Sequence, residues 1–93
     1  MPDESRMWVV TGRVQGVGFR WFAVRQAEAL GLVGWVRNQD DGSVEVVAKG
    51  PEASMRQMEE ALRRGPAGAK VINLESTQIQ HELVDAKSFV VKH

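Results

Sequence analysis

The sequence contains no cysteine, no tyrosine and only two histidines, and its 12 Lys and Arg residues balance its 12 Asp and Glu residues. The absence of cysteine excludes disulfide bonds, thiolate metal sites and cysteine nucleophiles. Two histidines are too few for a metal site built from several imidazoles. A net charge of zero argues against a protein that holds nucleic acid by bulk electrostatic attraction. The composition therefore favours chemistry that needs neither a thiol nor a histidine-rich site.

With 93 residues, the chain has the length of one domain. A hydrophobic share of 43% and a charged share of 26% are typical of a folded globular chain rather than a disordered one. No apolar run approaches the roughly 20 residues of a membrane-spanning helix, and the polar, acidic residues 1–6 do not resemble a secretory signal. We therefore expect a flexible N-terminal tail at residues 1–6 and a single domain at residues 7–93. We also expect a cytoplasmic monomer that binds no membrane.

In the first half of the chain, the spacing of apolar residues changes from that of a strand to that of a helix. Residues 7–14 are rich in β-branched and aromatic side chains, which predicts a strand. A glycine-containing turn follows at residues 15–20, and after it Phe22 and Leu30 recur at helical spacing. Gly31 is a natural end for this predicted helix.

The second half contains two strong boundary signals. The Asp-Gly pair at residues 41–42 predicts a hairpin between two strands, and Pro51 suits the first position of a second helix that ends at Gly65. The pattern predicts strands at residues 33–38, 43–49 and 88–92 and a helix at residues 51–64. A further strand begins at residue 69 and extends to about residue 78, and the pattern leaves its end open. This order, βαββαβ with an extra terminal strand, predicts an α+β, ferredoxin-like sandwich. In it, two helices cover one face of an antiparallel sheet of four strands plus a short fifth.

The turn at residues 15–20 is the first candidate for chemistry, because it joins a strand to a helix. Gly16 and Gly18 allow successive backbone N–H groups to point inward and form an anion site at the helix N-terminus. Arg20 follows, and its guanidinium can hold a phosphate or a carboxylate with two donors at any accessible pH. Taken alone, such a turn is more often only a tight bend. It lacks the Gly-Lys-Ser/Thr of a Walker loop, and Trp21 stands where a dinucleotide-binding fingerprint has its third glycine.

Charge is unevenly distributed around this turn. From residue 6 to residue 38 there are five arginines and a single acidic residue, Glu28. The neutral total therefore conceals a basic first half, which we expect to gather around the turn.

Asn38 is the second candidate, because it ends a predicted strand just before the hairpin. Its carboxamide can hold a water molecule through the carbonyl oxygen while the NH₂ group donates elsewhere. Asparagine is also common at strand ends as a simple turn residue, so both interpretations stay open. For the aromatic residues that can line a site, core packing is the expectation for most: Trp8, Phe19, Phe22 and Trp35.

Two segments match long motifs of a known family. The run GRVQGVGFR at residues 12–20 resembles the first signature of the acylphosphatases. The run GWVRN at residues 34–38, followed by DGSVE at residues 41–45, resembles the second. The likeness extends from about Met7 to Glu75, and residues 89–91 resemble the family's last strand.

The resemblance implies an enzyme that hydrolyses the carboxyl–phosphate bond of acyl phosphates to a carboxylate and inorganic phosphate. It implies catalytic roles for Arg20, which completes the grip on the phosphoryl group, and for Asn38, which orients the attacking water. It also implies a set of phosphate-binding residues that act through backbone N–H groups: Gln15, Gly16, Val17, Gly18, Phe19 and Arg20. The expected partner is a small-molecule acyl phosphate, with no metal, cofactor or nucleic acid. Because the leaving group is a weakly basic carboxylate, positioning and charge stabilisation meet most of the demands of the reaction.

Two alternatives remain open. The chain can be a non-catalytic anion- or RNA-binding module on the same ferredoxin-like fold, although its strands lack the paired Phe/Tyr pattern of RNA-binding sheets. Domains of this kind also occur at the front of larger carbamoyl-transfer maturation proteins. The short chain with its initial methionine favours the stand-alone form.

Overall fold

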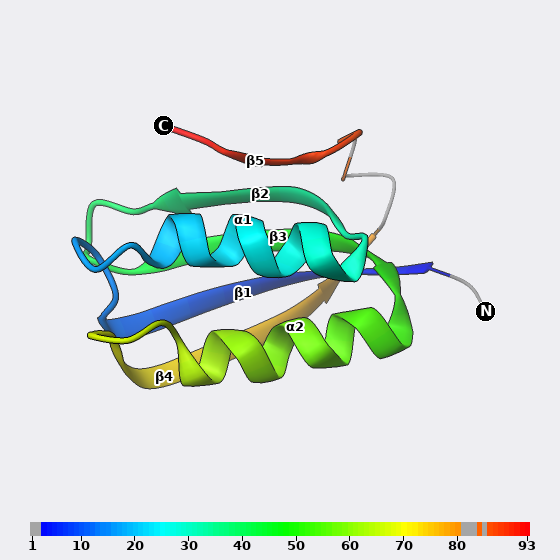
Figure 1. Cartoon of the computed structure of the whole chain (residues 1–93). Helices are drawn as coiled ribbons and strands as arrows, with labels where there is room; N and C mark the ends of the chain where they lie inside the picture. The colour runs from blue at the N-terminus through cyan, green and yellow to red at the C-terminus, as the bar shows by residue number, and fades with distance from the viewer. Residues whose placement is uncertain (1–2, 81–83, 85) are drawn as a thin grey trace.

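The computed structural model describes residues 3–80, 84 and 86–93. Its helices and strands follow one another in the order β1 (Asp3–Arg13), α1 (Phe19–Leu30), β2 (Val33–Asn38), β3 (Val44–Pro51), α2 (Glu52–Arg64), β4 (Lys70–Ile79) and β5 (Phe89–Val91). Both helices pack on one face of a single sheet (Figure 1). The predicted α+β, ferredoxin-like arrangement is therefore confirmed.

The sheet has the strand order β4-β1-β3-β2-β5. The pairs β1–β3, β1–β4 and β2–β3 are antiparallel, whereas β5 runs parallel to β2, so the sheet is mixed rather than wholly antiparallel. The direction of β5 follows from where β4 ends. Ile79 pairs with Ser5, which pairs with Lys49, which pairs with Val33 at the start of β2. The chain thus leaves β4 at the end of the sheet where β2 begins, and a strand added beside β2 from that end runs the same way.

Several element boundaries differ from those predicted, most of them by one or two residues. Strand β1 begins at Asp3 rather than at Met7, and residues 3–6 pair with residues 48–51 of β3. The predicted tail at residues 1–6 is therefore part of the sheet from Asp3 onward, because backbone pairing does not require apolar side chains. Pro51 ends β3 and caps α2 with an extended ψ of 146°, instead of occupying the first helical position.

The core lies between the sheet and the two helices. Side chains at alternate positions of β1 and β3 are buried beneath the helices. They include Trp8 and Val10 of β1 and Val44 and Val46 of β3. The helices contribute buried residues at helical spacing: Phe19, Phe22, Ala23 and Ala27 of α1, and Met55, Met58 and Leu62 of α2. Neither helix in the described part of the chain is long and apolar enough to cross a membrane.

Three segments that are distant in sequence lie at the same end of the molecule. Figure 1 shows the turn between β1 and α1, the turn between β2 and β3, and the C-terminus together at this end. The two sequence motifs and the last strand therefore meet there.

Candidate functional site

The turn between β1 and α1 has the backbone conformation that its glycines predict. Gly16 and Gly18 have φ angles of 76° and 75°, in the left-handed region that other residues rarely adopt. A Cβ atom at either position would have no neighbour within 4 Å, so the backbone angle and not a lack of space favours glycine. We call residues 15–20 the anion loop.

The N–H groups at the end of this loop are available for a ligand. Gly18 caps α1 without a side-chain hydrogen bond, and the first turn of α1 carries no acidic residue. In the described ranges, the N–H groups of residues 15–18 do not donate to backbone carbonyls. The first N–H groups of a helix also have no partner within the helix. The loop therefore presents free donors and the positive end of the helix dipole, which together suit an anion.

A cavity of about 360 Å³ opens above the anion loop. Its wall includes Gly16, Gly18 and Arg20 from the first motif and Asn38 from the second. The fold thus brings together the two predicted catalytic residues, which are 18 positions apart in the sequence. The remaining wall residues are Val14, Phe19, Trp21, Val91 and His93.

The side chain of Gln15 joins the two motifs directly. Its Nε2 donates hydrogen bonds to the backbone carbonyl oxygens of Gln39 at 2.8 Å and Ser43 at 2.9 Å. Gln39 follows Asn38 in the chain, so the Gln15 side chain connects the anion loop to the turn that comes directly after Asn38. The sequence pattern pointed only to the backbone of Gln15, and nothing in its spacing indicates this side-chain contact.

Asn38 lies at the last position of β2, paired with Val44 of β3. Its Oδ1 atom is buried and has no hydrogen-bond partner among the residues that the structure describes. Buried polar atoms are normally hydrogen-bonded, and this atom belongs to a residue of the cavity wall. A carbonyl oxygen with free acceptor capacity at this place can hold a water molecule next to a bound anion.

The predicted phosphate-binding residues do not all lie in the same environment. Gly16, Gly18 and Arg20 line the cavity, whereas Val17 packs partly against the core. Phe19 also borders the cavity but is only 1% exposed and belongs to the hydrophobic core.

The expected gathering of arginines around the turn is correct only in part. Within the described residues, Arg20 is the one arginine that lines the cavity. Arg6 donates to Glu4 and Ser76, and Arg37 forms an ion pair with Glu45 at 2.9 Å. Arg6 therefore lies away from this cavity, whereas Arg37 lines a neighbouring cavity together with Asn38 and His93. A charge count along the sequence does not distinguish these two positions.

Four residues of the cavity wall were not identified as site residues from the sequence: Val14, Trp21, Val91 and His93. Val14 ends the predicted first strand, and an apolar residue there indicates core packing. Trp21 follows Arg20 directly in the chain, and this adjacency was the one sequence feature that could have placed Trp21 at the site. Val91 and His93 come from the last strand and the residues after it. They reach the cavity because β5 pairs with β2 so that Val91 lies beside Val36.

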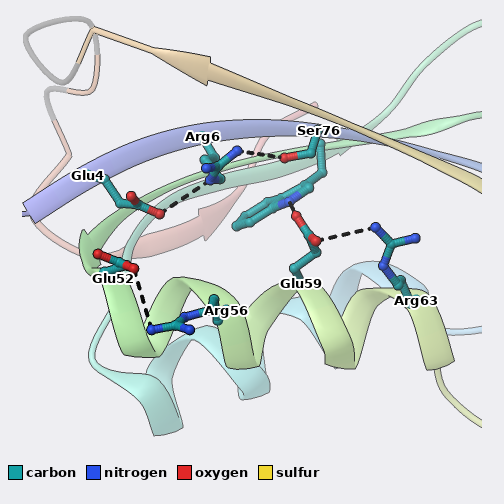
Figure 2. Close-up of polar contacts among 8 residues, drawn as sticks. Glu4, Arg6, Glu52, Arg56, Glu59, Arg63 and Ser76 are labelled. Atoms are coloured by element: carbon teal, nitrogen blue, oxygen red, sulfur yellow. Dashed lines mark hydrogen bonds and ion pairs between the residues drawn. The ribbon is translucent and has the colours of Figure 1, made fainter.

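A second cavity, of about 310 Å³, lies between α2 and the strands β1 and β4. Figure 2 shows the three ion pairs around it: Arg6 with Glu4 at 3.2 Å, Arg56 with Glu52 at 3.4 Å and Arg63 with Glu59 at 3.3 Å. The pKa of Glu59 is lowered, chiefly because the indole N–H of Trp8 donates to its carboxylate at 2.8 Å. These charges neutralise one another, so this cluster has the character of a structural network and not of an anion site.

Known proteins resemble the chain in both sequence and structure. The family model described as acylphosphatase matches residues 7–91. An acylphosphatase of Koribacter versatilis is 47% identical over 90 residues, which are 97% of this chain and 81% of that protein. The crystal structure of acylphosphatase from Bacillus subtilis has a TM-score of 0.90 and 38% identity, covering 96% of this chain and 98% of that one.

An acylphosphatase structure from Coxiella burnetii has a TM-score of 0.91 and 38% identity, covering 98% of this chain and 94% of that one. The matches span nearly the whole chain and include both motifs that meet at the anion loop. The chain therefore belongs to the acylphosphatase family.

Proposed function

We propose that the chain hydrolyses the carboxyl–phosphate bond of acyl phosphates by direct attack of water, without a metal or a cofactor. One observation carries this proposal: Arg20, the glycines of the anion loop and Asn38 line the same cavity. Family membership supports the reaction, and this juxtaposition supports the roles that we propose for the residues.

The anion loop holds the phosphoryl group. Its N–H groups and the N-terminus of α1 surround the phosphoryl oxygens, and the Arg20 guanidinium neutralises part of their charge. In phosphoryl transfer most of the catalysis comes from positioning and from stabilising charge on the transferring oxygens. A rigid ring of donors can meet both needs because it does not reorganise during the reaction.

Asn38 places the attacking water. The water donates one hydrogen to Asn38 Oδ1, and its oxygen forms a bond to phosphorus on the side opposite the acyl group. The bond between phosphorus and the bridging oxygen breaks, and its electron pair remains on the carboxylate that leaves. The proton of the water passes to a phosphoryl oxygen, so the products are a carboxylate and inorganic phosphate. A carboxylate is a weak base and needs no proton from the enzyme to depart.

The alternative role, RNA binding, would use the sheet face opposite the helices, and the contacts on that face do not favour it. Single-stranded RNA usually stacks on exposed aromatic rings of such a face. Trp35, which lies on this face, has the Lys92 ammonium 4.0 Å from its ring centroid and donates to Glu45 at 3.3 Å. Its ring and its N–H group are therefore engaged within the protein. We infer that the chain acts on a small acyl phosphate as a cytoplasmic monomer of one domain, which includes residues 3–6 of β1 besides residues 7–93. We also infer that it binds neither nucleic acid nor membrane.

The direct test is hydrolysis of acetyl phosphate by the purified chain, with and without a chelator such as EDTA. We expect release of inorganic phosphate at the same rate in both conditions. Loss of activity with the chelator would overturn the metal-free mechanism, and absence of activity in both would overturn the proposed reaction.

Arg20→Ala tests the anion loop in the same assay. Removal of one donor to a transition-state oxyanion costs about 100- to 1000-fold in rate, so we expect a loss of kcat/KM in this range and weaker inhibition by inorganic phosphate. Arg25→Ala is the matched control, because Arg25 is an exposed arginine of the same helix outside the cavity wall. An Arg20 variant that behaves like the Arg25 variant would show that the phosphoryl group binds elsewhere.

A further inference from the structure

Trp21 is an exposed aromatic residue at the edge of the cavity. It lies in the first turn of α1 and is 62% exposed, whereas Trp8 is fully buried in the core. Three large hydrophobic residues of the described part of the chain are exposed, namely Trp21, Ile72 and Val90. Of these three, Trp21 alone lines the cavity that contains Arg20 and Asn38.

The covalent structure of an acyl phosphate determines where its acyl group must lie. One bridging oxygen separates the phosphorus from the carbonyl carbon, so a phosphoryl group on the anion loop leaves the acyl group within the same cavity. The part of the wall that is not assigned to phosphoryl binding or to the water consists of Val14, Trp21, Val91 and His93. With a volume of about 360 Å³, the cavity falls in the range of pockets that hold small organic ligands.

We propose that Trp21 forms the binding surface for the acyl group and that the preferred substrates are acyl phosphates with an aromatic acyl group. This inference rests on the proposed function. The indole is a flat apolar surface, and aromatic rings pack on it in offset or edge-to-face arrangements. Val91 adds an apolar contact from β5, which brings two distant parts of the chain to the same group. An acetyl group is too small to cover such a surface.

The contact acts on binding and leaves the phosphoryl chemistry unchanged. The acyl group lies against Trp21 both in the bound substrate and in the transition state, so the contact should lower KM with little effect on kcat. An aromatic pair of this kind corresponds to roughly a tenfold difference in affinity.

The test compares benzoyl phosphate with acetyl phosphate for wild type, Trp21→Ala and Trp21→Phe. We expect Trp21→Ala to raise KM for benzoyl phosphate about tenfold and to change KM for acetyl phosphate less than twofold. Trp21→Phe should recover most of the benzoyl phosphate KM because it retains an aromatic face. Inhibition by inorganic phosphate should be the same in all three proteins, since phosphate occupies only the anion loop.

Ile72→Ala provides a control, because Ile72 is 73% exposed and lies outside the cavity wall. An equal loss on both substrates in Trp21→Ala, or weaker inhibition by phosphate, would overturn the inference, since Trp21 would then act through the anion loop. A wild-type protein that hydrolyses neither substrate would instead overturn the proposed function, and the acyl site with it.

Discussion

Asn38 combines two properties that suit a residue beside a phosphoryl group. Its side chain is neutral, and its buried Oδ1 has free acceptor capacity in the described part of the chain. A carboxylate at this position would accept a hydrogen bond from water equally well, but its negative charge would repel the phosphoryl oxygens. An amide orients the water without this repulsion.

We expect Asn38→Ala to lower kcat about 100-fold while KM changes little, because the lost interaction serves the attacking water and not the bound substrate. Steady-state kinetics with acetyl phosphate checks this expectation. Asn73→Ala is the matched control, since Asn73 is an exposed asparagine of β4 outside the cavity wall. Asn38→Asp keeps the shape of the side chain but adds a negative charge. This variant should be as slow as Asn38→Ala and should also bind inorganic phosphate more weakly. A rise in KM without a fall in kcat would contradict the proposed role of Asn38.

Among the elements, the turn between β2 and β3 is held by its own side chains. Asp41 accepts hydrogen bonds from the Ser43 backbone N–H at 2.9 Å and from the Ser43 hydroxyl at 2.6 Å. These two bonds lower the pKa of Asp41, with the hydroxyl contact the larger cause. Gln39 Nε2 donates to the Ser43 hydroxyl at 3.0 Å. The turn that follows Asn38 is therefore internally braced, and Gln15 connects it to the anion loop.

Gln15→Ala should remove this connection and leave both elements intact. A displacement of about 1 Å between catalytic groups can cost on the order of 100-fold in rate. Since the turn keeps its internal hydrogen bonds, we expect a smaller loss, about tenfold in kcat, with nearly unchanged inhibition by phosphate.

The kinetic constants and the unfolding midpoint of Gln15→Ala would be compared with those of Gln57→Ala, because Gln57 is an exposed glutamine of α2. A kcat loss without a matching loss of stability supports a positioning role. If kcat stays within twofold of wild type, the link between the loop and the turn does not serve catalysis.

At the scale of the whole molecule, one polar contact joins the centre of the sheet to a helix. The indole N–H of Trp8, a fully buried residue, donates to the carboxylate of Glu59 on α2 at 2.8 Å. Glu59 also forms the ion pair with Arg63 that is visible in Figure 2. Because the indole N–H of Trp8 has no other hydrogen-bond partner among the residues that the structure describes, loss of Glu59 would leave a buried donor unpaired.

We expect Glu59→Ala to lower the free energy of unfolding by about 1–3 kcal/mol, the cost of an unsatisfied buried donor. Urea unfolding followed by circular dichroism measures this difference. Glu60→Ala is the control, because Glu60 is the exposed neighbour on the same helix. Equal stability of the two variants would show that the Trp8 contact contributes nothing measurable.

The same contact predicts how stability depends on pH. The folded-state pKa of Glu59 is lowered, chiefly by the Trp8 hydrogen bond. Its contribution is therefore fully present above the ordinary glutamate value of about 4.3 and is lost as the pH falls through the lowered folded pKa. Glu59→Gln keeps an acceptor for Trp8 but cannot titrate. Its unfolding free energy should decrease less steeply than that of wild type as the pH falls below about 4.3. Parallel curves for the two proteins would contradict this assignment.

The local parts of the fold were predictable because each depends on neighbouring residues. Apolar periodicity and the conformations of glycine predict three such features. They are the change from strand to helix at the anion loop, the end of α1 at Gly31 and the hairpin at Asp41-Gly42. The two motifs likewise contain Arg20 and Asn38 at their ends, and the family expectation that they carried is confirmed.

The sequence by itself therefore determined the order of the elements, the shape of the anion loop and membership of the acylphosphatase family. Only the tertiary structure decided which residues share the cavity, because Arg20, Asn38, Trp21 and Val91 meet through pairing between strands that are distant in the chain. The same reason explains the early start of β1 and the parallel direction of β5. Strand pairing depends on where partner strands begin and end, and local composition does not encode this.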